Sequence, residues 1–138
     1  MTKQSMKDIG PDAHAVEVIG SAAPAFTLAF LRACPDAVAI LNSKGRVGFL
    51  NQTGRTLMDL DTSETVTGRR WWDLWPEDER AGLQAAFDRA LSGQLVKLGA
   101  ARTSSGGERR RWDLTLSPII NLDGQTESVL LVARAPGV

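Results

Sequence analysis

Arg111-Trp112-Asp113-Leu114-Thr115-Leu116-Ser117-Pro118-Ile119 is the stretch of the chain in which large apolar and polar side chains alternate most clearly. Successive side chains of a β-strand point to opposite faces of the sheet, so Trp112, Leu114 and Leu116 share one face. The alternation predicts a strand with one buried face. Such strands are typical of antiparallel sheets that pack one face on a core.

Turn sequences and further apolar runs extend this sheet. Ser104-Ser105-Gly106-Gly107 precedes the strand and Asp123-Gly124 follows it, while Asn42-Ser43-Lys44-Gly45 separates two earlier apolar runs. These compositions are typical of turns between strands. The predicted strands cover residues 37–41, 46–50, 95–102, 109–120 and 126–134.

Helices are predicted between the two groups of strands. The longest covers residues 76–91, with Pro76 suited to the first turn and acidic residues 77–79 near the positive end of the helix dipole. Shorter helices are predicted at residues 52–60 and 71–75. Strands at both ends with helices between them favour an α+β fold with one antiparallel sheet. The first hairpin would pair with the last strands, and the helices would cover one face.

The chain divides into four predicted parts. Residues 1–20 show no sustained period and are expected to be a flexible leader. An amphipathic helix is expected over residues 21–34, ending before Pro35, because apolar residues recur there at helical spacing. The globular domain covers residues 35–135, and residues 136–138 form a tail.

The amino-acid composition argues against several classes of binding partner. Sixteen basic and sixteen acidic side chains cancel, which removes the charge excess that binding to nucleic acid or to an anionic membrane surface needs. The lone Cys34 cannot form an internal disulfide, and no apolar run reaches the roughly 18 residues of a membrane span. We therefore expect a cytoplasmic protein without nucleic-acid or membrane partners.

Four segments, in this order and spacing, resemble the PAS domain family. They are residues 34–41, 45–51, 68–80 and 111–119, the last followed by the turn at Asp123-Gly124. The resemblance runs from about Ala33 to Arg134. It implies a five-stranded antiparallel sheet of strand order 2-1-5-4-3, with helices enclosing a pocket against one face. Members of the family sense small molecules, light or redox state, or pair with other proteins.

The resemblance disfavours two cofactors. Haem-binding relatives carry a histidine on the long helix or an adjoining strand, whereas His14 is the only histidine here and lies in the leader. Relatives that bind flavin covalently place their cysteine in a helical motif, whereas Cys34 precedes the first strand. One histidine and one cysteine cannot complete a zinc site, so no metal is expected. The cofactor stays unknown, with a non-covalent flavin or a small metabolite left open.

The four tryptophans are the strongest hint of a ligand. Indole rings can stack on a planar molecule or donate an N–H to it, although they can equally fill a core. We expect a pocket between the sheet and the helices. Its boundary would be drawn from Ile40, Phe49, Leu57, Trp72, Leu74, Phe87, Leu98, Leu114 and Val132.

Catalysis is not expected. The acidic cluster Asp73, Glu77, Asp78 and Glu79 is typical of a solvated helix start, and no nucleophile with a base partner is found. Arg109, Arg110 and Arg111 alternate between the faces of a strand and so do not form one basic patch. No catalytic residue is therefore assigned.

These observations predict a sensory PAS module that binds a small ligand and signals through a homodimer or another protein, such as a kinase or regulator. The amphipathic helix would cover the outer sheet face or reach a second subunit, because Leu41, Leu50, Val129 and Leu131 would otherwise be exposed there. A ligand-free scaffold and a small isomerase or hydrolase of similar fold are the alternatives. The expected dimer contacts are Phe26, Ala29, Phe30 and Ala33.

Overall fold

The computed structural model describes residues 29–58, 66–103 and 106–135. Two compact units divide the chain, Met1–Ala33 and Cys34–Val138. In the first unit, residues 29–33 are helical. The expected leader, the part of the expected helix before residue 29, Phe26 and the tail lie outside the described residues. The sheet and the longer helices belong to the second unit.

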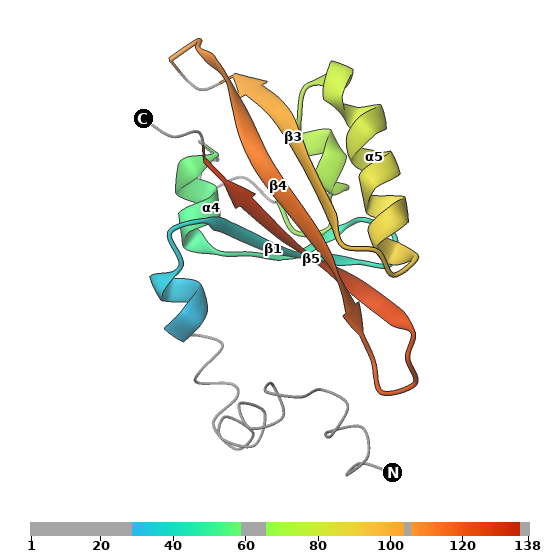
Figure 1. The fold of residues 1–138 in the computed structure, drawn as a ribbon. Coiled ribbons are helices and arrows are strands. Elements are labelled where there is room, and N and C mark those ends of the chain that lie inside the picture. The colour runs from blue at the N-terminus through green and yellow to red at the C-terminus, as the bar shows by residue number, and fades with distance from the viewer. Residues whose placement is uncertain (1–28, 59–65, 104–105, 136–138) are drawn as a thin grey trace. The chain divides into compact units, whose positions relative to one another are not determined.

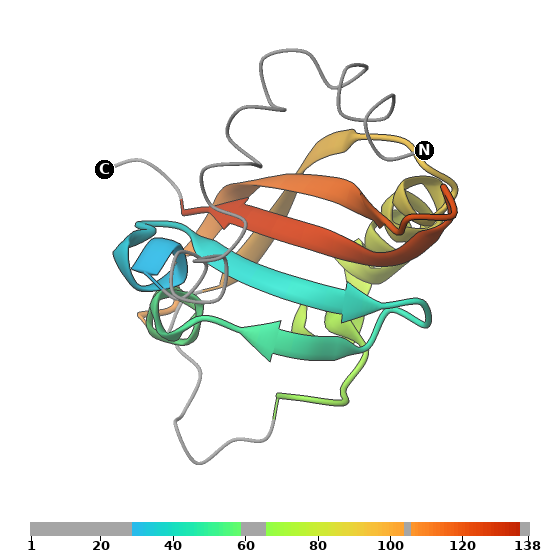
Figure 2. The same ribbon diagram turned by 90° about the horizontal axis from the view of Figure 1, so that it is seen from below.

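One antiparallel sheet of five strands forms this second unit, in the order β2-β1-β5-β4-β3. Figure 1 shows the strands crossing the unit, and Figure 2 shows β2, β1, β5 and β4 side by side. The predicted fold class and strand order are confirmed. The strands are β1 Ala37–Asn42, β2 Val47–Leu50, β3 Val96–Thr103, β4 Arg109–Ile120 and β5 Thr126–Arg134.

The helices of this unit lie between β2 and β3 in the chain. They are α4 Gln52–Leu57, the 3-10 helix η2 Trp71–Leu74 and α5 Glu77–Leu91. The predicted helix over residues 52–60 is shorter, because Met58 is its C-cap, and residues 59 and 60 lie outside the described part. No helix within the described residues has the length and apolar character that crossing a membrane requires.

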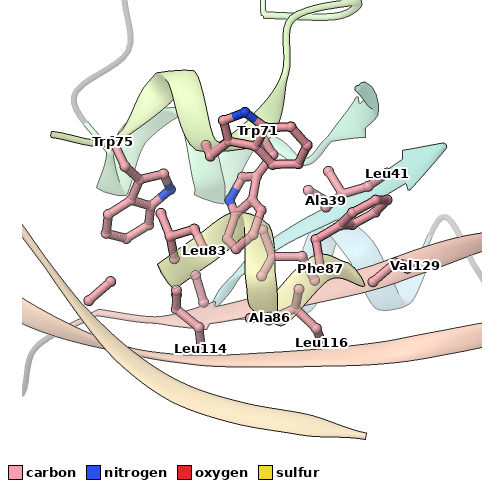
Figure 3. Close-up of a cluster of buried hydrophobic side chains, with 14 of the residues drawn as sticks. Ala39, Leu41, Trp71, Trp75, Leu83, Ala86, Phe87, Leu114, Leu116 and Val129 are labelled. Carbon is pink, nitrogen blue, oxygen red and sulfur yellow. The ribbon is translucent and has the colours of Figure 1, made fainter. Parts of the chain in front are cut away.

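Helix α5 packs on β3, β4 and β5, whereas α4 packs on β1. Leu83, Ala86 and Phe87 of α5 meet Leu114 and Leu116 of β4 (Figure 3). Their spacing along the helix puts them on a single side, and the alternation along β4 does the same for its leucines. The predicted buried face of β4 is therefore confirmed.

The faces of β1, β2 and β5 are the reverse of the expected ones. Leu41, Val129 and Leu131 are buried in the core against the helices, and Leu50 packs against that core. Ile40, which pairs with Phe49, and Val132, which pairs with Val38, therefore lie on the opposite face. The reason is that the apolar runs of β1 and β5 are nearly continuous, so alternation does not distinguish their two faces.

The hairpin of β4 and β5 extends beyond β3. Pairing between β3 and β4 begins at Val96 and Leu116, whereas β4 continues to pair with β5 through Pro118 and Ile120. Leu122, in the connecting turn, is fully exposed. Figure 1 shows this hairpin projecting from the unit.

Candidate ligand cavity

A small apolar cavity lies between the inner face of the sheet and the segments around α4 and η2. The free volume of the cavity is about 10 Å³, which is roughly what one water molecule needs. No residue of α5 takes part. The lining residues are Ala37, Ala39, Val47, Leu50, Met58, Val66, Trp71, Leu74, Trp75, Leu131 and Ala133.

Small side chains on the sheet make this space. Ala37 and Ala39 of β1 and Ala133 of β5 line the cavity, and Ala37 pairs directly with Ala133. Beneath α5 the same sheet face carries Leu114 and Leu116 instead. Because an alanine side chain ends at Cβ, three of them on neighbouring strands leave a gap below the side chains that face them.

Asn51 holds α4 against β1 beside the cavity. Its side-chain oxygen accepts hydrogen bonds from the amides of Val38 at 3.0 Å and Gly54 at 2.9 Å, and its Nδ2 donates to the carbonyl of Asp36. Asn51 thus caps α4 and fixes it to the strand. Gly54 permits this approach, because a Cβ there would lie 2.6 Å from Leu50 and 2.9 Å from the Asn51 oxygen.

Two indole N–H groups at the cavity have no hydrogen-bond partner among the described residues. They belong to Trp71, which is 1% exposed, and Trp75, which is 2% exposed. In Figure 3 the nitrogen of Trp75 is on the side of its ring that faces Trp71. Burying a donor without an acceptor costs roughly 1–3 kcal/mol. Two lining residues of the cavity therefore carry a buried donor that no described residue satisfies.

Arg102 of β3 ties the two helical segments at the cavity together. Its guanidinium donates to the carbonyls of Met58, at 3.1 Å, and Leu74, and lies 5.7 Å from the centre of the Trp75 ring. Both carbonyls belong to lining residues. A movement of either residue therefore changes the bonding of a charged group on β3.

The expected pocket residues divide into three groups. Leu74 lines the cavity. Ile40, Phe49 and Val132 lie on the opposite sheet face, because the inner faces of β1, β2 and β5 are formed by the alternate residues. The others belong to the core or pack against it without lining the cavity: Leu57, Trp72, Phe87, Leu98 and Leu114.

The remaining tryptophans fill the core. Trp72 packs on Phe87 with ring centres 5.7 Å apart, and Trp112 meets Trp75 edge to face at 6.2 Å. Sequence reasoning missed the alanines and Met58 as lining residues. The small side chains of Ala37 and Ala39 on one face of a predicted strand were the available signal.

Other expected features are placed as follows. Cys34 is partly buried and unpaired. Arg109 pairs with Asp78 and Arg110 with Glu108. Within the described part, no three histidine, cysteine or acidic side chains gather in a way that could hold a metal. Of the expected dimer contacts, Ala29, Phe30 and Ala33 belong to the helical residues of the first unit, and Phe30 is 53% exposed.

A second hollow lies on the outer face of the sheet. It measures about 210 Å³, and it is open and polar. Two acidic and two basic residues surround it, so its charges balance. Its lining residues are Asp36, Lys97, Asp113, Thr115, Val132 and Arg134.

The model of one protein family, described as the PAS fold, matches residues 31–136. The chain belongs to the PAS family. The sheet order and the cavity between sheet and helices therefore describe a PAS domain. The sequence-based assignment is confirmed. No curated protein matches the chain.

Solved structures with this PAS fold share little sequence with the chain. The PAS domain of a Colwellia psychrerythraea protein has a TM-score of 0.70 and 15% identity, covering 82% of this chain and 96% of that one. The VqmA dimer of Vibrio cholerae has a TM-score of 0.67 and 16% identity, covering 80% and 52%. An RNA-binding light-oxygen-voltage receptor has a TM-score of 0.66 and 17% identity, covering 81% and 33%. The PAS domain thus corresponds to about half of the VqmA chain and a third of that receptor.

Proposed function

We propose that this PAS domain is a non-enzymatic sensory module of the cytoplasm that binds a small molecule in the cavity beside Trp71 and Trp75. The observation that carries the proposal is the pair of buried indole N–H groups without a partner, among the described residues, at an otherwise apolar cavity. A site that orients a ligand typically combines apolar walls with a few polar groups. A structure of VqmA bound to DPO supports the use of this fold for ligand binding.

Binding would be sensed through Met58, Leu74 and Arg102. Because the free volume is about 10 Å³, any molecule larger than water must displace lining side chains. Met58 is unbranched and adaptable, and Leu74 is only partly buried. Arg102 bonds to the carbonyls of both residues, so a displacement at the cavity would reach β3.

A ligand-free scaffold is the second candidate, and the small free volume favours it. In that case the interior is complete in itself and only the surface contacts matter. The test is native mass spectrometry of freshly purified protein, with an absorption spectrum of the same sample. A mass excess that disappears on denaturation, or bands beyond the tryptophan envelope, supports ligand binding. A bare chain whose thermal midpoint no metabolite in a screen raises would favour the scaffold.

For output we propose a homodimer formed through the outer sheet face. The hollow there carries Asp36 and Asp113 beside Lys97 and Arg134, so a twofold axis can place the acids of one copy on the bases of the other. A kinase or regulator would then read the dimer. Light scattering should show a dimer that Lys97→Glu weakens and Lys97→Glu with Asp113→Lys restores. A strict monomer at high concentration contradicts the proposal.

A further inference from the structure

We infer that the ligand of the cavity is a compact, uncharged molecule that offers hydrogen-bond acceptors, such as a carbonyl oxygen or a ring nitrogen, and no donor. This inference rests on the proposed ligand-binding function and specifies its chemistry. The recognising groups are the Nε1–H of Trp71 and the Nε1–H of Trp75.

The chemistry of the lining sets the direction of the hydrogen bonds. An indole nitrogen is a donor and never an acceptor. The other lining side chains in the described part of the chain are alanine, valine, leucine and methionine, and among these the Met58 sulfur alone is a weak acceptor. A ligand acceptor thus has two donors to meet, whereas a ligand donor would meet no side-chain oxygen of the described lining residues.

The lining residues that the structure describes carry no charge, which favours an uncharged ligand. Among the described residues no acidic or basic side chain lines the cavity, and an ion buried without a partner is strongly disfavoured. The guanidinium of Arg102, on β3, already donates to the carbonyls of Met58 and Leu74. The small free volume of the cavity also indicates that the molecule is compact.

Water satisfies these donors less well than such a ligand does. A water oxygen can accept from an indole, but its own two hydrogens then need acceptors, and buried waters typically make about three hydrogen bonds. The apolar lining supplies little for those hydrogens. A carbonyl compound brings the acceptor without the extra donors and places its hydrocarbon part against the alanines.

The test compares cyclopentanone with methylenecyclopentane, which has the same shape and no acceptor oxygen. Protein labelled with ¹⁵N in its tryptophans gives four indole N–H resonances, one for each tryptophan. The ketone should move the Trp71 and Trp75 proton resonances to lower field and leave those of Trp72 and Trp112 nearly in place. The hydrocarbon should produce no such movement. Titrations on wild-type protein and on Met58→Ala, which enlarges the cavity, give the affinities.

Trp75→Phe removes one donor and keeps an aromatic ring. It should weaken the ketone about tenfold, the equivalent of one lost hydrogen bond, and change hydrocarbon binding much less. If this variant folds poorly, the indole resonance shifts of the wild-type protein test the inference instead. Ketone binding that shifts neither the Trp71 nor the Trp75 resonance overturns the inference, and so do equal shifts with the ketone and the hydrocarbon. In both cases the proposed ligand-binding function is not contradicted. Binding of neither probe to either protein also overturns it, and native mass spectrometry then judges the proposed function separately.

Discussion

The two halves of the interior lie on the same face of one sheet and are filled differently. Under α5, leucines of β4 meet Leu83 and Phe87, and all of these side chains are buried. Around α4 and η2, alanines of β1 and β5 face Trp71 and Trp75, and a cavity is left whose two indole donors have no partner among the described residues. The comparison teaches that side-chain size on the sheet decides which half is closely packed and which half keeps a cavity. We expect the first half to carry stability and the second to respond to ligands.

The largest effect is expected from a substitution in the packed half of the interior, under α5. Leu83→Ala removes a side chain that is 1% exposed and should lower the free energy of unfolding by about 2–5 kcal/mol. Met58→Ala at the cavity should cost about 2 kcal/mol or less, because Met58 already borders empty space and loses fewer contacts. Chemical denaturation of both variants measures the difference. Equal costs would remove the distinction between the halves.

Hydrogen bonds, rather than close packing, are expected to hold the cavity half. Asn51→Ala leaves the amides of Val38 and Gly54 without their buried acceptor and should cost about 2–4 kcal/mol. Asn51→Asp keeps the oxygen that accepts from both amides, and when protonated at mildly acidic pH it can still donate to the carbonyl of Asp36, so under those conditions it should cost clearly less. Urea denaturation compares the two. An alanine variant as stable as the aspartate variant would show that these bonds do not fix α4.

The packed half also has a polar attachment, which is expected to contribute less. Glu79 of α5 accepts a hydrogen bond from the amide of Ala101 on β3, the edge strand. Glu79→Ala should cost about 1–2 kcal/mol, and Glu79→Gln, which retains an acceptor, less than half of that. Hydrogen exchange at the Ala101 amide should accelerate in the alanine variant. Unchanged exchange there would exclude this attachment.

The smallest effect is expected at Asp78, the residue before Glu79. Asp78 pairs with Arg109 at 2.8 Å, but the two side chains are 67% and 44% exposed. Exposed pairs of this kind contribute little, so Asp78→Asn should change the free energy of unfolding by no more than about 0.5 kcal/mol. Thermal denaturation at low and high salt checks it. A loss as large as that of Glu79→Ala would show that exposure does not separate these two contacts.

Much of the fold follows from local sequence pattern. The strands at residues 109–120 and 126–134 were predicted with their observed bounds, because turn sequences delimit both and β4 alternates clearly. The long helix differs by one residue, since Pro76 is its N-cap and not its first residue. These elements are specified by short-range periodicity and turn chemistry, which one sequence contains.

The candidate site was less predictable. In β1 and β5 both faces are apolar, so the choice of the inner face depends on pairing with the rest of the sheet. That choice put Ile40, Phe49 and Val132 on the wrong side of the sheet. The tryptophans were recognised as candidates, but which indole nitrogens stay without partners depends on the packed arrangement of distant segments. Periodicity does not contain that information.

The projecting β4–β5 hairpin has a consequence for solubility. Beyond Leu116 no described residue of β3 pairs with β4, so this part of β4 is an unpaired edge of the kind onto which a foreign strand can add. Pro118 has no amide hydrogen and therefore cannot donate a hydrogen bond to an added strand. Replacing it by valine would restore the donor beside exposed Ile120 and Leu122. We therefore expect Pro118 to oppose edge-to-edge aggregation of this hairpin.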